Sequence, residues 1–284
     1  MNLFDTHTHL DDPVFDNDRI ECAHSAYRHC VRRIMLVGYR AAYFERMALA
    51  AQQIKSAKRR VVAIPEVHLA YGLHPAYIAH HTQQDLSVLK GYLESADALG
   101  EIGLDRYTQE LKEKQAFCKQ LDFFRSQLDM AQDFDKPVLL HIRKAHGEAL
   151  REIKDSGFDR GGIAHSFSGG EQEAIAFTEL GFKLGVTTQI TNPNAKKLIR
   201  AVQAVGIKHL VLETDSPDML PFQLHEPGNL NRNEPKNLCR GLVALAQILG
   251  VELEELADVL WRNSLQALHI SVQSDSDSSK FEQS

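Results

Sequence analysis

Short apolar runs alternate with helical patterns along almost the whole of this 284-residue chain, and this alternation restricts the fold more than any other feature. Strand alternating with helix is typical of the βαβ units that build a parallel sheet. We predict strands at Leu3–His7, Ile34–Val37, Val67–Gly72, Ala98–Ile102, Pro137–His141, Gly162–His165, Phe182–Val186 and His209–Glu213. Helical spacing of apolar residues predicts helices at Ala41–Ile54, Glu110–Phe134, His146–Ser156, Glu171–Leu180 and Ala195–Val205.

Eight such units in about 250 residues favour an α/β fold, a closed TIM-type (β/α)8 barrel, over a doubly wound open sheet. The chain offers no Gly-rich dinucleotide fingerprint to support the open sheet. Two more helical stretches, Pro235–Leu249 and Leu253–Leu268, are expected to pack outside as extra C-terminal helices. We predict one domain over residues 1–270. Residues 271–284 are rich in Ser, Asp and Gln without periodicity and are predicted to be disordered.

Charge and composition exclude several classes of protein. The formal net charge is -6, so no global basic field attracts nucleic acid, and a polyanionic substrate must be attracted by metal ions or a local cluster. No apolar run approaches the ~18 residues that span a membrane, and the start of the chain does not read as a signal peptide. We therefore expect a cytoplasmic protein with no membrane and no stable protein partner. The four cysteines form no CxxC, which argues against a disulfide framework or a zinc ribbon.

The first predicted strand carries the first candidate metal ligands. It contains Asp5-Thr6-His7-Thr8-His9, and alternate side chains of a strand point to the same face. His7 and His9 therefore project together, and two adjacent imidazoles can hold a divalent cation. Taken alone, such a pair more often consists of polar residues that end a strand without binding a metal.

Further nitrogen and oxygen donors follow other predicted strands, and they strengthen the metal hypothesis. They are Glu101, His141, His165 and Asp215. The carboxyl ends of barrel strands open onto one face, so donors far apart in sequence would converge there. Each donor alone has a structural explanation, such as capping the next helix. Six donors at five strand ends together predict a metal site.

The size of this donor set indicates two metal ions. Six protein ligands are too many for one tetrahedral zinc, and they suit two divalent ions that share a carboxylate. We predict Glu101 as the bridge and Asp215 as the group that takes a proton from a metal-activated water. Imidazole and carboxylate ligands fit zinc or manganese, with magnesium less suited. The other ligands divide into two centres: His7, His9 and Asp215 in one, and His141 with His165 in the other.

Six segments of the chain together form a specific ordered pattern. They are Asp5-Thr6-His7-Thr8-His9-Leu10, Gly72-Leu73-His74-Pro75, Gly100-Glu101-Ile102-Gly103-Leu104-Asp105, Leu140-His141-Ile142-Arg143, His165-Ser166-Phe167-Ser168-Gly169 and Leu212-Glu213-Thr214-Asp215-Ser216-Pro217. This set resembles the TatD family of metal-dependent deoxyribonucleases, and within it the YjjV-type branch. The resemblance spans residues 3–268 and implies a distorted, amidohydrolase-like (β/α)8 barrel, divalent metals on the six ligands above, and hydrolysis of phosphodiesters, usually of DNA.

The chain departs from this family pattern at three places, none of which removes a metal ligand. Ala76 stands where the family often has a second His after His-Pro. Ile142 and Lys144 flank Arg143 where the family often has Ser and an acid, and Ser166 replaces a common Cys. The departures therefore leave the prediction of a metal-dependent hydrolase unchanged, while they affect positions where a nucleic-acid substrate would bind.

Several residues are candidate substrate contacts. Arg232 and Lys236, with Asn233 between them, would clamp a phosphate, the guanidinium of Arg232 offering a planar fork. The alternative is a helix start that Asn233 or Glu234 caps, with Pro235 in the first turn. Arg143 lies next to His141 at the expected mouth of the site, its alternative being a surface ion pair. His74 ends the third predicted strand, where it touches substrate or bonds to backbone.

The sequence thus predicts a divalent-metal-dependent hydrolase of ester bonds, a phosphodiesterase or deoxyribonuclease that prefers single strands or free ends. Its substrate would be a nucleic acid or a small phosphoester. Two alternatives remain: a binuclear amidohydrolase or lactonase that acts on a small molecule, and a non-catalytic metal-binding protein. Glu101 stands where many amidohydrolase relatives use a carboxylated lysine, which favours the TatD-like reading. All six predicted ligands are present, which argues against the non-catalytic alternative, because a site that has lost its activity usually loses some of its ligands.

Overall fold

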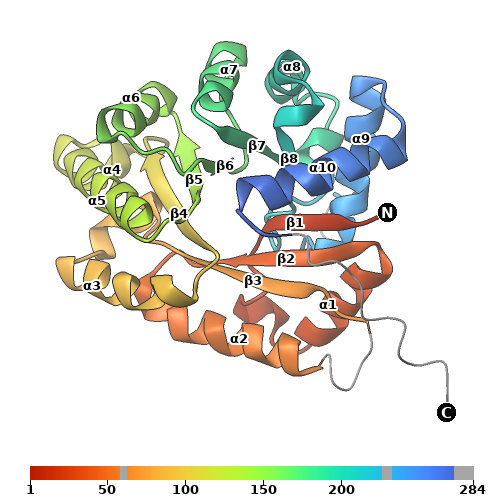
Figure 1. The fold of residues 1–284 in the computed structure, drawn as a ribbon, viewed down its shortest axis with the longest axis horizontal. Helices are drawn as coiled ribbons and strands as arrows, with labels where there is room; N and C mark the ends of the chain where they lie inside the picture. Colours follow the sequence, from red (N-terminus) through yellow and green to blue (C-terminus); the bar gives the residue numbers. More distant parts are fainter. Residues whose placement is uncertain (58–62, 226–231, 272–284) are drawn as a thin grey trace.

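Eight parallel strands form the centre of the molecule, and their order in the sheet follows their order in the sequence (Figure 1). The computed structural model describes residues 1–57, 63–225 and 232–271. This arrangement confirms the predicted TIM-type (β/α)8 fold. The strands are β1 (Leu3–Thr8), β2 (Val31–Val37), β3 (Glu66–Tyr71), β4 (Ala98–Asp105), β5 (Val138–Arg143), β6 (Gly162–Ala164), β7 (Phe182–Val186) and β8 (Leu210–Leu212).

Helices surround the strands in Figure 1, and the predicted ones lie where apolar spacing placed them. Two helices were not predicted, α1 and α3. α1 buries Cys22, Ala23 and Ala26 but no large apolar side chain, so its periodicity is weak in the sequence. The helices are α1 (Arg19–Arg28), α2 (Phe44–Ala57), α3 (Gln83–Tyr92), α4 (Gln109–Lys112), α5 (Lys114–Asp133), α6 (His146–Ser156), α7 (Glu171–Glu179), α8 (Lys196–Val205), α9 (Leu238–Leu249) and α10 (Leu253–Ala267).

The two ends of the sheet meet just beyond the last strand, and this seam brings distant parts of the chain together. The backbone N–H of Asp215 donates to the carbonyl of His7 at 2.9 Å. The backbone N–H of His9 donates to the carbonyl of Ser216 at 2.8 Å. The seam therefore sets two histidines of the first strand segment against the aspartate that follows β8.

Apolar side chains from most of the strands fill the barrel interior below the carboxyl ends. They pack against the end of α10, which crosses β1 and β8 in Figure 1 and covers the opposite, amino end of the barrel, where Leu268 lies near Glu66 and Pro137. Successive strand residues point to opposite faces, so the alternate residues are free to pack against the outer helices. The interior cluster consists of Phe4, Met35, Val37, Ala70, Ala98, Leu139, Ile163, Val211, Leu265, Ala267 and Leu268.

β4 runs three residues further than the sequence indicated, and Gly103 explains the difference. We expected this strand to end at Ile102, before the glycine. Instead Gly103 has a φ of 140°, and a Cβ there would lie 2.0 Å from the backbone oxygen of His141. Only glycine permits this close approach of β4 to β5. As a result the strand continues to Asp105, whose side chain reaches the site described below.

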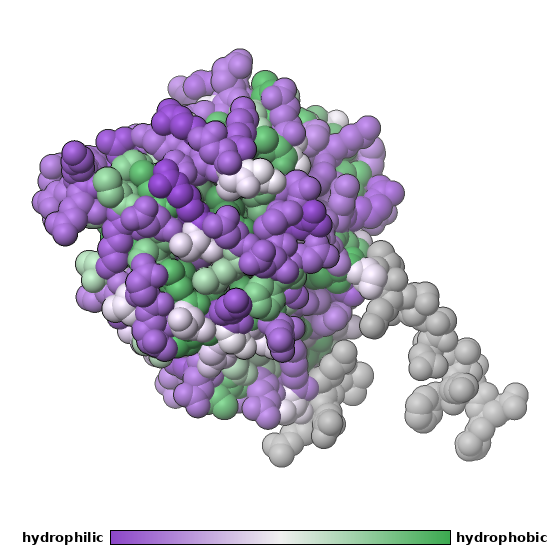
Figure 2. Space-filling model, turned by 60° about the vertical axis from the view of Figure 1, so that its left-hand side comes forward, coloured by the Kyte–Doolittle hydropathy of each residue, from purple (hydrophilic) through white to green (hydrophobic). Residues whose placement is uncertain are grey.

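The outer surface is mostly hydrophilic on the face that Figure 2 brings forward, with apolar side chains in small groups between polar ones. Within the described residues, no helix is long and apolar enough to cross a membrane. The predicted disordered tail, 271–284, lies outside the described residues except for Ser271.

Candidate metal centre

A cavity of about 600 Å³ opens at the carboxyl end of the barrel, where parallel-barrel sites are built. The predicted ligands His9, Glu101, His141, His165 and Asp215 line it, and His7 is fully buried beneath them. The strand ends therefore converge as the sequence predicted, although the ligands span more than 200 residues of chain.

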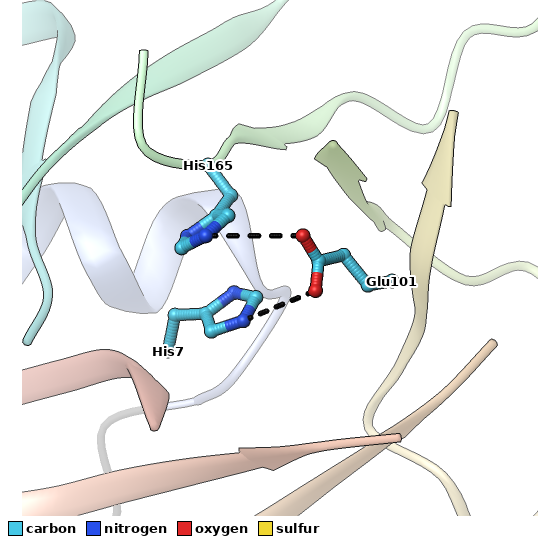
Figure 3. A group of neighbouring side chains, drawn as sticks. All are labelled: His7, Glu101 and His165. Carbon is cyan, nitrogen blue, oxygen red and sulfur yellow. Dashed lines mark ion pairs between the residues drawn. The ribbon is translucent and has the colours of Figure 1, made fainter. Parts of the chain in front are cut away.

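Glu101 is the centre of the cluster, with four imidazoles around its carboxylate. Its Oε2 lies 3.4 Å from Nε2 of His7, and its Oε1 lies 3.8 Å from Nε2 of His165 (Figure 3). The same Oε1 lies 2.9 Å from Nδ1 of His141 and 3.5 Å from Nε2 of His74. Burial alone raises the pKa of a carboxyl group, but these imidazoles outweigh it and hold the pKa of Glu101 well below its usual range.

Asp215 forms the opposite wall of the cluster. Its Oδ1 lies 3.7 Å from Nε2 of His9 and 3.8 Å from Nε2 of His7. Its Oδ2 lies 3.6 Å from Nε2 of His165. Burial raises the pKa of Asp215, but the neighbouring histidines, His165 foremost, outweigh burial and lower the pKa below its usual value. This carboxylate is therefore ionised at neutral pH.

Most of these separations fit a divalent ion better than direct hydrogen bonds. Nitrogen-to-oxygen gaps of 3.4–3.8 Å exceed the 2.7–3.2 Å of an N–H···O bond. Two ligands at about 2.1 Å from a tetrahedral ion lie about 3.4 Å apart. In the part of the chain that the structure describes, three groups of residues each bring their ligand atoms within 4.8 Å of one another, and none of these groups contains a cysteine. They are His7, Glu101 and His165; His7, His9 and Asp215; and His74, Glu101 and His141.

The charges around two stacked histidines also suit a cation. The rings of His7 and His165 lie 3.5 Å apart at 20°, too close for both to carry a proton's charge comfortably. Burial, and then His165, lowers the pKa of His7, which keeps that imidazole neutral and able to bind metal. Burial opposes charge on His165 as well, but Glu213, Asp215 and Glu101 raise its pKa well above the usual value. The carboxylates that stabilise a proton on His165 would also stabilise a divalent ion bound to this imidazole in place of the proton.

The structure brings His7, His9 and Asp215 together as in the first predicted centre, but it separates the two histidines of the second. We expected His141 and His165 to share one ion. Instead His165 lies with His7, while the ring of His141 lies 4.1 Å from that of His74. Both ring nitrogens of His141 face carboxylates, and Nε2 is 3.0 Å from Oδ2 of Asp105. Glu101 belongs to two of the three groups, which agrees with a bridging role for its carboxylate.

His74 is oriented as a hydrogen-bond donor. Its Nδ1 accepts a bond of 3.0 Å from the backbone N–H of Ala76. Burial, reinforced by His141, lowers its pKa to about 4, so the ring is neutral near pH 7. The single proton of the ring then sits on Nε2, which faces Glu101. In this state Nε2–H is a donor toward Glu101, and a metal would bind this nitrogen only in place of its proton.

Glu213 is a site residue to which the sequence analysis gave no role. It is fully buried, and its Oε1 lies 2.9 Å from Nδ1 of His165 and accepts the N–H of Ser166 at 2.5 Å. A carboxylate behind a histidine fixes which nitrogen faces the metal. Gly185 makes room for it, because a Cβ there would lie 2.4 Å from Oε1 of Glu213. The sequence signal that could have identified Glu213 is its position as an acidic residue directly after an apolar strand.

Replacing this carboxylate is expected to weaken metal binding without unfolding the barrel. Glu213→Gln keeps the shape and an acceptor oxygen for Ser166 but removes the charge behind His165. We expect about a 10–100-fold loss of metal affinity, the usual cost of losing such a partner. Titration of metal-free protein with Zn²⁺ or Mn²⁺ measures it, with Glu254→Gln on the exposed surface of α10 as the matched control. Equal affinities in the two variants would remove Glu213 from the site.

The predicted substrate contacts at Arg232 and Asn233 need correction, because neither side chain lines the cavity. The guanidinium of Arg232 donates to the carboxylate of Asp18 and lies 4.3 Å from the ring of Phe15. Asn233 is fully buried and donates to the carbonyl of Thr214 at 2.9 Å. Asn233 therefore supports the segment around Asp215 from behind, while Arg232 is held against the segment that leads into α1. The structure agrees better with the alternative of a helix start, since Pro235 begins a 3₁₀ turn that leads into α9.

Arg143, by contrast, lies on the cavity wall as predicted. Its guanidinium carbon lies 3.8 Å from the ring centre of Tyr107, which follows β4. Tyr39 and Tyr77 line another part of the wall, with ring centres 5.3 Å apart. Sequence patterns did not single out these tyrosines, because loops carry no periodicity that would orient them.

A family described as TatD related DNase matches residues 4–269, and so includes every ligand above. The chain belongs to the TatD-related DNase family. An uncharacterized metal-dependent hydrolase from Haemophilus influenzae is 34% identical over 94% of this chain and 99% of its own length. The metal-dependent hydrolase YjjV from Escherichia coli is 31% identical over 92% of this chain and 96% of its own. Deoxyribonuclease TATDN3 from Homo sapiens is 27% identical over 93% and 94%.

Solved structures place this TatD-related chain in the same fold class. The crystal structure of Escherichia coli YjjV has a TM-score of 0.81 and covers 95% of this chain and 98% of its own. N-isopropylammelide isopropylaminohydrolase from Burkholderia multivorans has a TM-score of 0.61 at 16% identity, over 94% and 74%, and shares the fold. The chain is thus a TatD-family member among metal-dependent hydrolases, with an amidohydrolase-like barrel.

Proposed function

We propose that this chain is a metal-dependent phosphodiesterase that hydrolyses DNA from single strands or free ends. The observation that carries the proposal is the pair of buried carboxylates, Glu101 and Asp215, set among imidazoles at ligand distances on the floor of a barrel cavity. We propose two divalent ions there, of zinc, manganese or magnesium. The name of the human relative, a deoxyribonuclease, supports the choice of substrate.

The residues around the site supply the parts that phosphodiester hydrolysis needs. Bound divalent ions would lower the pKa of a water and polarise a phosphoryl oxygen. Asp215, ionised at neutral pH, is oriented to take the proton of the attacking water. The Nε2–H of His74 is positioned to donate to a phosphoryl oxygen, and Arg143 lies at the mouth where a negative substrate enters.

The cavity walls favour a flexible strand over an intact duplex. The site lies at the floor of a concavity, which a phosphate inside a duplex does not easily reach. Tyr77 is 37% exposed, and its ring packs against Tyr39, with the guanidinium carbon of Arg40 5.6 Å from its centre. Exposed aromatic rings backed by a cation are the surfaces on which unpaired bases stack. A strand end can therefore enter and be held.

The proposal is tested with 3′-labelled and 5′-labelled oligonucleotides, single-stranded and duplex, incubated with Mg²⁺, Mn²⁺ or Zn²⁺. We expect shortened products from single strands or frayed ends, and none once a chelator removes the metal. RNA and bis(p-nitrophenyl) phosphate in parallel define the class of phosphoester. If no phosphoester is cut with any metal while an amide or lactone is turned over, the small-molecule amidohydrolase alternative replaces the nuclease.

A further inference from the structure

A second cavity of about 410 Å³ lies beside the metal cavity and shares part of its wall. Arg143 and Ser168 line both cavities, so the two open next to each other. We propose that this second cavity, named here the basic groove, binds a phosphate next to the scissile one on an oligonucleotide. The proposal rests on the function proposed above and specifies a substrate longer than a single phosphodiester.

Cations from separate parts of the chain gather on the basic groove. Arg143 ends β5, Lys144 follows it, and Lys197 lies near the start of α8. Lys144 and Lys197 are exposed. Lys197 uses one donor on the carbonyl of Ser168 at 2.8 Å, which leaves two of its three donors. Among the described residues, no hydrogen bond or ion pair involves the side chain of Lys144. Since the whole chain has a net charge of -6, attraction of an anionic ligand would depend on local cations such as these.

The two carboxylates on the basic groove do not balance its three cations. Glu148 accepts a bond of 2.7 Å from Arg106, a fourth cation that offsets its charge. Glu173 accepts the backbone N–H of Gly170 at 2.6 Å and caps α7, and because that partner is neutral Glu173 keeps its negative charge. Three cations and one uncompensated carboxylate leave the basic groove positive and able to attract an anionic ligand.

Tyr107 adds the second feature of a site for single strands. Its side chain is 54% exposed, and Arg143 stacks on one face of the ring. A stacked guanidinium still presents edge N–H groups to a phosphate, in the fork geometry that suits it. Grooves that bind single strands combine backbone-tracking cations with exposed aromatic rings. This combination favours an oligonucleotide over a small neutral substrate.

Salt dependence of binding tests the basic groove independently of hydrolysis. The probe is a fluorescent single-stranded 8-mer, with affinity measured by anisotropy in chelator over a series of salt concentrations. The variant Lys144→Gln/Lys197→Gln removes two charges and is compared with Lys55→Gln/Lys90→Gln on α2 and α3. We expect about tenfold weaker binding at low salt and a log–log salt slope reduced by about 1.4, since each contact on a single strand contributes roughly 0.7. An unchanged slope, or the same change in the control, would overturn the proposal.

A chemical counterpart locates the contact on the substrate. Single methylphosphonate linkages, which are neutral, are placed at successive positions of the 8-mer. One position should weaken binding to the unmodified protein and have no further effect on Lys144→Gln/Lys197→Gln. Additive losses at every position would contradict a shared contact. Failure of the nuclease proposal is visible separately, because it would leave these binding results intact while no oligonucleotide is cut.

Discussion

Asp215→Asn should fold and bind substrate but lose about 10²–10⁴-fold in the rate of hydrolysis, the usual contribution of a positioned general base. The amide keeps the size of the carboxylate, and the backbone N–H of residue 215 still bonds to the carbonyl of His7. What disappears is the charged oxygen that lies 3.6 Å from His165 and the acceptor for the proton of water. We therefore expect the backbone hydrogen bonds of the seam to be retained while the rate of hydrolysis falls.

Rates on bis(p-nitrophenyl) phosphate and on a single-stranded oligonucleotide measure this loss, with metal content and thermal unfolding determined on the same samples. Asp218→Asn is the matched control, since that carboxylate lines the same cavity but is absent from the groups of potential ligands. It should lose less than about tenfold. If Asp215→Asn kept its metal and its rate, the acceptor would have to be another residue.

Glu101→Ala is expected to disturb metal binding more than any other single ligand change. Four imidazoles surround this carboxylate, and it belongs to two of the donor groups. Without it two bound cations would face each other with no shared anion between them. We expect metal affinity to fall more than about 100-fold, beyond the 10–100-fold cost of losing an outer partner. His141→Ala should weaken one ion only.

Elemental analysis of protein purified without chelator, followed by titration of the metal-free form, compares the two variants. Glu101→Gln is included because it keeps the volume of the side chain among the histidines, so that a loss of metal is not confused with a loss of fold. Circular dichroism checks the barrel in each case. A Glu101→Ala protein that holds as much metal as His141→Ala would exclude the bridging assignment.

The sequence predicted the barrel and the convergence of the ligands because both follow from simple periodicities. Alternation along β1 placed His7 and His9 on one side, and their Nε2 atoms lie 3.4 Å apart. Parallel topology then brought Glu101, His165 and Asp215 to the same end of the barrel. These inferences needed only the direction of each strand and the face of each residue.

Details that depend on side-chain direction or on close backbone approach were beyond such patterns. Asp105 was missed because Gly103 looked like the end of a strand, while it serves as the point where two strands touch. Arg232 looked like a phosphate clamp because its type suits one, but Asp18 lies within its reach and takes the guanidinium. The pairing of His141 with His74 depends on the directions of both side chains, which residue spacing does not specify.

The seam between β1 and the segment after β8 gives the site a dependence on chain completion. His7 lies in β1, and Asp215, which follows β8, is joined to it by a backbone hydrogen bond across more than 200 residues of chain. A chain that stops before Asp215 thus holds His7 and His9 without the carboxylate that faces them both. Closure of the seam and metal binding are thermodynamically linked, because each favours the state that the other requires. A metal bound by His7, His9 and Asp215 would thus hold the beginning and the end of the barrel together.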